Sequence, residues 1–128
     1  MIEQGIVLYD IEMDGCLNGV YTNENHATAG VIFNEIARKK GSSLKESDSA
    51  KDWDIEGEYD CMWFDIGTHP DNRENAILVI SRKATSPRVF DVTWLDVTTR
   101  NPRFAGTGYF MNSRQFVVRY EQSKPINT

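Results

Sequence analysis

The chain has 128 residues, of which 40% are hydrophobic and 26% charged, and its formal net charge is −5. This length and composition are typical of one globular domain and exclude the disordered class. The excess of acid argues against a surface that follows nucleic-acid phosphates, because such a surface needs clustered Lys and Arg.

The first residues, the apolar runs and the two cysteines indicate in which part of the cell we expect this protein. The first residues include Glu3 and no basic stretch, so they do not resemble a signal peptide. No apolar run approaches the roughly 20 residues that span a bilayer. We therefore expect a cytoplasmic protein that does not bind membranes. Cys16 and Cys61 are expected to be reduced core thiols, and neither has a Cys or His at metal-ligand spacing.

Alternating apolar and polar residues recur in short segments, with turn signals roughly every 8–15 residues. The predicted strands cover residues 6–13, 17–23, 31–37, 53–65, 76–82, 89–95, 104–111 and 116–120. No stretch has the pattern of an amphipathic helix. The sequence therefore predicts an all-β, antiparallel, up-and-down meander in one domain, 1–128. About eight such strands close a small barrel, and a two-sheet sandwich is the alternative.

Two polar segments interrupt or end this pattern. Composition changes sharply to Gly, Ser, Lys, Glu and Asp in 39–52, which predicts a surface loop. The tail 123–128 is polar and contains a proline, so we expect it to be loosely held.

The segment 53–65 is the most regular of the predicted strands, with Asp and Glu on one face and aromatic residues on the other. Its Gly57 has counterparts in Gly19 and Gly106, and a glycine within a strand marks a bend or a close approach of another backbone. The predicted interior of this strand and the next two comprises Tyr59, Cys61, Trp63, Leu78, Ile80, Phe90, Val92 and Trp94.

The first hairpin allows two registers. A two-residue loop at Asp14-Gly15 pairs Leu8 with Tyr21, and it places Asp10 and Glu12 on the inward face. A carboxylate inside a barrel costs several kcal/mol unless it is paired or solvated. We favour the alternative, in which a bulge turns the apolar set inward, namely Val7, Tyr9, Ile11 and Met13.

Two short motifs resemble the calycin barrels, and the avidin side of that group most closely. They are Leu17-Asn18-Gly19-Val20-Tyr21-Thr22-Asn23 and Ile55-Glu56-Gly57-Glu58-Tyr59. The resemblance implies an eight-stranded meander with a small-molecule site at one open end. It also implies that Asn23 donates a hydrogen bond to the ligand and that Tyr21 forms part of the barrel floor. Tyr21 stands where the family has Trp, so the resemblance names no ligand.

Three functions are compatible with these patterns. The first is a barrel that binds a small apolar or aromatic ligand, without cofactor or metal. The second is an oligomeric, non-enzymatic interaction domain with a solid core, and the third is an enzyme that uses an acid and a tyrosine at the barrel mouth. A cavity separates the first from the second. The candidate ligand-binding residues are Tyr21, Asn23, Tyr59, Trp63, Arg82 and Trp94.

The outer face of the segment 53–65 turns apolar toward its end. A turn centred near Pro70-Asp71 pairs Phe64 with Ile77 and Met62 with Val79, and the next turn brings Leu95 beside Ile77. These five apolar side chains then form one patch, and soluble monomers rarely expose such a patch. The sequence thus predicts a homo-oligomer, most simply a dimer, that associates through this face.

Overall fold

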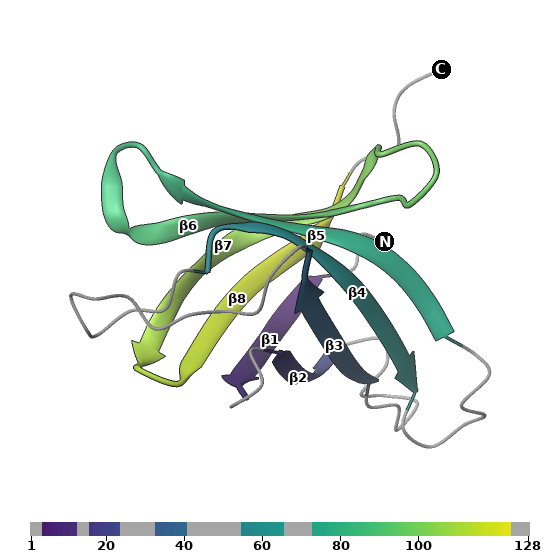
Figure 1. Ribbon diagram of the computed structural model, residues 1–128, viewed down its shortest axis with the longest axis horizontal. Coiled ribbons are helices and arrows are strands. Elements are labelled where there is room, and N and C mark those ends of the chain that lie inside the picture. Colours follow the sequence, from purple (N-terminus) through teal and green to yellow (C-terminus); the bar gives the residue numbers. More distant parts are fainter. Residues whose placement is uncertain (1–3, 13–15, 24–32, 41–54, 66–72, 124–128) are drawn as a thin grey trace.

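The computed structural model describes residues 4–12, 16–23, 33–40, 55–65 and 73–123. Within these ranges eight antiparallel strands follow one another around a closed barrel, and β8 pairs with β1 (Figure 1). The all-β meander and its closure into a barrel are confirmed, and the sandwich alternative is wrong. The strands are β1 (Gln4–Ile11), β2 (Leu17–Asn23), β3 (Phe33–Lys39), β4 (Gly57–Asp65), β5 (Arg73–Lys83), β6 (Ser86–Leu95), β7 (Pro102–Asn112) and β8 (Gln115–Gln122).

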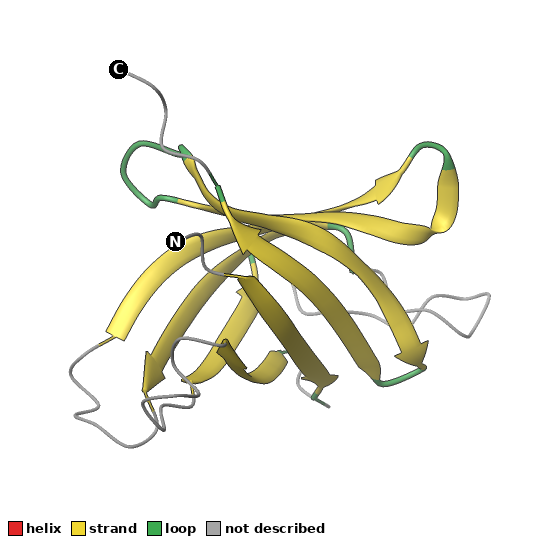
Figure 2. Cartoon of the chain, turned by 180° about the vertical axis from the view of Figure 1, so that it is seen from behind, coloured by secondary structure: helices red, strands yellow, loops and turns green. Residues whose placement is uncertain are grey.

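Seen from behind, the described part of the chain consists of strands and short connections (Figure 2). Nowhere in those ranges is there a helix with the length and hydropathy needed to cross a membrane. Most of the predicted loop 39–52 and of the tail 123–128 lies outside the described residues. Lys39, however, still belongs to β3, so the strand runs past the point at which the loop was expected to begin.

The core is the inside of the barrel, and every second residue of each strand points into it. All eight residues predicted for the interior are buried. At one end the rings of Phe90, Phe110 and Phe116 fill the barrel, with centroids 5.2–5.9 Å apart. Cys16 and Cys61 are both buried as thiols. The interior is therefore closed by aromatic packing at the end where β6 begins.

The first hairpin adopts the register that turns the apolar residues inward. Val7 pairs with Tyr21, and Tyr9 pairs with Gly19. The two-residue loop is wrong, because Glu12 N donates to Cys16 O (2.9 Å) and the connection is longer than two residues. A shift of one residue moves every side chain to the other face, so Asp10 lies outside. Met13 lies outside the described residues.

The register predicted between β4 and β5 is also wrong. Phe64 pairs with Arg73 and Met62 with Asn75, because β5 begins at Arg73 and pairs residues that were expected in the turn. Ile77 lies opposite Asp60 instead of Phe64. The error is an even number of residues, so it leaves each side chain on its predicted face. That is why the predicted interior is right although the predicted pairs are not.

Two of the three glycines singled out in the sequence have a clear structural reason, namely Gly106 within β7 and Gly57 at the start of β4. A Cβ added to Gly106 would lie 2.0 Å from the backbone oxygen of Arg119, so β7 and β8 approach too closely there for any side chain. Gly57 has a φ of 143°, a conformation that favours glycine. The close approach at Gly106 is one of the two causes expected for a glycine within a strand.

A candidate ligand-binding cavity at one end of the barrel

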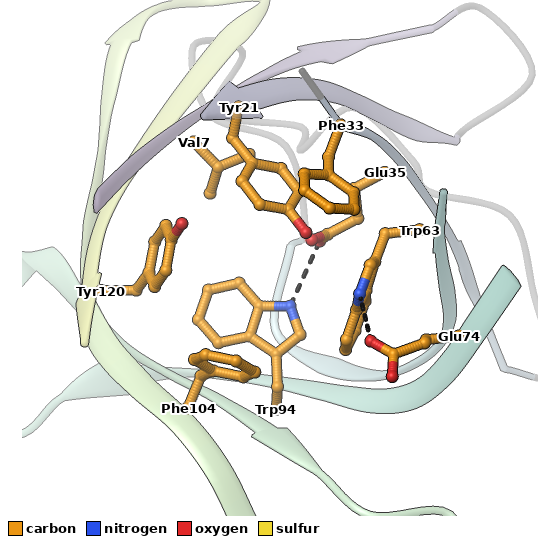
Figure 3. A pocket seen from close by; sticks show the side chains of 9 residues that line it. All are labelled: Val7, Tyr21, Phe33, Glu35, Trp63, Glu74, Trp94, Phe104 and Tyr120. Atoms are coloured by element: carbon orange, nitrogen blue, oxygen red, sulfur yellow. Dashed lines mark hydrogen bonds between the residues drawn. The ribbon is translucent and has the colours of Figure 1, made fainter. Parts of the chain in front are cut away.

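The end opposite the Phe90 cluster is hollow. It contains a cavity of about 150 Å³ to which all eight strands contribute (Figure 3). The cavity lies where β2, β4, β6 and β8 end and where their antiparallel neighbours begin. Its lining consists of Val7, Tyr21, Phe33, Glu35, Trp63, Glu74, Trp94, Phe104 and Tyr120.

Six aromatic rings surround this space (Figure 3). Tyr21 and Phe33 are stacked, with centroids 5.3 Å apart. Tyr120 meets Tyr21 edge to face at 5.9 Å, and it meets Trp94 at 5.8 Å. Phe104 completes the contacts on the far side, since it packs against Trp63, Trp94 and Tyr120. Edge-to-face contacts fix the orientation of rings, so this wall is formed before a ligand arrives.

Glu35 places a carboxyl group inside the aromatic wall. It points inward because Phe33, Glu35 and Ala37 alternate along β3, and its side chain is only 3% exposed. Tyr9 Oη and Trp94 Nε1 (3.2 Å) both donate hydrogen bonds to Oε2 of this carboxyl. Burial raises the pKa of Glu35 from 4.5 to about 7, although hydrogen bonds from Trp94 and Cys61 act in the opposite direction. Near neutral pH the group is therefore poised between its charged and neutral forms.

Cys61 lies next to this carboxyl group. Burial, and then the negative charge of Glu35, raise the pKa of the Cys61 thiol well above its usual value. Thiolates are the reactive form of cysteine, so Cys61 remains a neutral, unreactive thiol in the core beside Glu35.

The rim of the cavity is held together by a second acid. Trp63 Nε1 donates to Glu74 Oε2 (2.8 Å), and a nitrogen of Arg103 lies 3.7 Å from Glu74 Oε1. The guanidinium of Arg103 lies over the Trp63 ring, 5.3 Å from its centroid. Arg103 reaches the rim because the β6–β7 ladder shifts register between Trp94 and Leu95, and such bulges re-aim side chains.

Three of the predicted ligand-binding residues line this cavity: Tyr21, Trp63 and Trp94. Two others are elsewhere. Tyr59 is fully buried at a distance from the cavity, and its hydroxyl donates to Ile55 O (2.6 Å). Arg82 is exposed near the Phe90 end, where its guanidinium lies 4.8 Å from the centre of that ring.

Asn23 is the remaining predicted ligand-binding residue. It pairs with Gly5 at the end of β2 that borders the cavity. Its side chain lies outside the described part of the structure, so its role stays a prediction.

Neither acid of the cavity is among the ligand-binding residues predicted from the sequence. The predicted strand 31–37 has apolar residues on both faces, so alternation does not single out the inward series Phe33, Glu35 and Ala37. The predicted strand 76–82 begins too late to include Glu74, although the inward series that includes Ala76 and Leu78 extends back to it. Phe104 and Tyr120 lie in predicted strands. The spacing of these strands in the sequence does not show that both rings meet at this end of the barrel.

Fold and site together define a closed eight-stranded antiparallel barrel with an aromatic, acid-containing cavity at one end. No group of three or more His, Cys, Asp or Glu that could hold a metal ion occurs in the described ranges. Comparison with family models, with curated proteins and with solved structures found no match to this chain. The cavity itself must therefore carry the functional argument.

Proposed function

We propose that this protein is a calycin-like barrel that binds a small molecule in the aromatic cavity. The observation that carries the proposal is the contrast between the two ends of the barrel. One end is filled by aromatic rings, whereas the other leaves about 150 Å³ unfilled although six large side chains line it. Protein interiors are normally packed without such voids, and an apolar cavity of about this size is enough for a molecule like benzene. The ligand is thus small, or it protrudes through the rim.

The resemblance to calycin barrels supports a ligand site at the same end of the barrel. In that interpretation the first hairpin contributes Tyr21 and Asn23 to a site at an open end. Tyr21 lines the cavity, and Asn23 lies in the same strand at the same end. The chemistry of the residues that line the cavity determines which class of ligand it can bind.

A matched pair of tyrosine variants tests the proposal. Small aromatic and aliphatic fragments, from benzene to indole in size, are expected to raise the melting temperature of the wild type, because a ligand that binds only the folded state stabilises it. Tyr21→Leu should weaken binding of each hit about tenfold, which corresponds to about 1.4 kcal/mol. Tyr109→Leu on the outer face, where Tyr109 is 52% exposed, should leave binding unchanged. An absence of hits, or an equal loss in both variants, contradicts the proposal.

An acid–base enzyme is the second candidate, and the hydrogen bond between Tyr9 and Glu35 favours it. A carboxyl group with a pKa of about 7 suits a general base at neutral pH. Two features favour binding instead. Tyr9 is fully buried and does not line the cavity, and Tyr9 and Trp94 donate to the same oxygen of Glu35. Turnover of a bound fragment that stops in Glu35→Gln would decide for the enzyme.

The homo-oligomer predicted from the outer face also stays a proposal. The five apolar residues of the predicted patch, however, are not all paired as expected. Ile77 is buried and lies beside Leu95, whereas Phe64 lies beside Arg73, whose guanidinium is 5.8 Å from the ring centre. A separate row of apolar residues, directly opposite one another on four strands, was not predicted. It consists of Tyr109, Val117, Leu8 and Val20.

Light scattering tests this association. We expect the wild type at micromolar concentration to be a dimer and Phe64→Glu to be a monomer, since a charge on the predicted patch opposes burial there. Val20→Glu is the matched control, because Val20 is 54% exposed and lies in the other apolar row. A monomeric wild type contradicts the predicted oligomer, and dissociation by Val20→Glu alone moves the interface to the row.

A further inference from the structure

Among the residues that the structure describes, those that line the cavity include acidic but no basic side chains. Its nine lining residues include two carboxylic acids, Glu35 and Glu74, and they include no Lys, Arg or His. Glu74 lies at the rim, where Arg103 is 3.7 Å away. Glu35 lies deep among the rings, so its charge is the one that the cavity leaves uncompensated.

The hydrogen bonds of Glu35 are those of an acceptor. Tyr9 and Trp94 are neutral donors, and both point to Oε2. A buried carboxylate is costly unless an opposite charge accompanies it. A ligand with a positive charge would supply that partner, whereas a neutral ligand would leave the carboxylate without one and an anion would be repelled by it.

The wall has the second property that a cation requires. The faces of aromatic rings attract cations, and desolvated rings do so most strongly. Indole, phenol and phenyl rings from six positions surround the space (Figure 3). The protein already uses this attraction at the rim, where the guanidinium of Arg103 lies 5.3 Å from the centre of the Trp63 ring.

From this arrangement we infer that the ligand is a small organic cation, an alkylated ammonium whose charge lies among the rings and pairs with Glu35. The inference rests on the proposed function, because it names the class of ligand for the same cavity. The cavity volume of about 150 Å³ limits the bound group to about the size of benzene. Tetramethylammonium fits this description and serves as the probe.

The test compares three molecules of similar shape and different charge: tetramethylammonium, neutral tert-butanol and anionic pivalate. Binding to the full chain is followed by NMR through the indole N–H signals of Trp63 and Trp94, which line the cavity. At pH 8.5 tetramethylammonium is expected to bind at least about tenfold more tightly than tert-butanol. Glu35→Gln should remove most of this difference by weakening the binding of the cation, because glutamine does not supply the negative charge. The matched control Glu74→Gln should retain most of the difference.

A second measurement needs no variant. Binding of the cation should weaken about tenfold between pH 8.5 and pH 5.5, because Glu35 becomes protonated in that range. Binding of tert-butanol should not change. Of the groups that face Glu35, Cys61 has a thiol pKa raised well above its usual value and stays neutral in this range, and Tyr9 and Trp94 donate hydrogen bonds to the carboxyl group. Glu74→Gln separates any contribution of the rim.

The outcomes distinguish this inference from the proposed function. If tert-butanol or pivalate binds as tightly as tetramethylammonium, the inference of a cationic ligand is wrong, whereas the proposal of a ligand-binding cavity stands. If the cation binds equally well to Glu35→Gln and at both pH values, the inference is also wrong. If none of the three probes binds, the inference fails, and the fragment experiment above decides on the cavity alone.

Discussion

Glu35→Gln is expected to be about 3 kcal/mol more stable than the wild type at pH 8.5, and about equally stable at pH 4. In the wild type, ionisation of Glu35 leaves a buried charge that lacks a cationic partner among the residues lining the cavity. A pKa difference of one corresponds to about 1.4 kcal/mol, so the rise from 4.5 to about 7 corresponds to about 3 kcal/mol. Glutamine keeps an oxygen that can accept from Tyr9 and Trp94 but never ionises.

The sign of this effect follows from proton binding. The folded state holds the proton of Glu35 more tightly than the unfolded state does, because burial raises its pKa. The contribution to stability is therefore complete below pH 4.5 and is lost as the pH rises to about 7. The test is to measure the free energy of unfolding in urea at several pH values. It compares the wild type, Glu35→Gln and the rim control Glu74→Gln. A constant difference between the wild type and Glu35→Gln across this range would show that Glu35 is not buried.

Trp63→Ala is expected to lower the free energy of unfolding by about 3–5 kcal/mol, the usual range for a large aromatic residue in a core. Trp63 is only 6% exposed, and it packs edge to face against Phe104. Its loss also removes the hydrogen bond to Glu74 and the ring beneath Arg103. Chemical denaturation measures the change.

The control for this prediction is Tyr109→Ala. Tyr109 is also a large aromatic residue on a strand, but it is 52% exposed on the outer face. Its replacement should cost less than about 1 kcal/mol. A loss below about 1 kcal/mol for Trp63→Ala as well would place Trp63 outside the core.

The fold could be predicted because strand periodicity determines which face each residue occupies. The segment 53–65 identified Tyr59, Cys61 and Trp63 as interior residues, and all three are buried. The pairing register between neighbouring strands was harder to predict, because it depends on the length of each connection. The pairing of Phe64 with Arg73 instead of Ile77 is a case in which the faces were right and the partners were not.

The site was only partly predictable, for a related reason. Trp63 and Trp94 could be proposed because they are aromatic and inward-facing on strands with clear alternation. Tyr21 could be proposed because its segment resembles the calycin barrels. Glu35 escaped notice because its strand contains apolar residues on both faces, so no pattern marked an acid as interior. A polar residue on the inward face of a barrel strand is a signal for a site, but it requires the correct face to be known first.

The most direct test of the account is an NMR titration of the Glu35 side-chain carboxyl carbon, with and without saturating tetramethylammonium. The free protein is expected to show a midpoint near pH 7, since burial among aromatic rings disfavours the charge. The cation should lower that midpoint by about one, because it binds the ionised form about tenfold more tightly. A midpoint near 4.5 in the free protein, or one that tetramethylammonium does not move, would contradict the account.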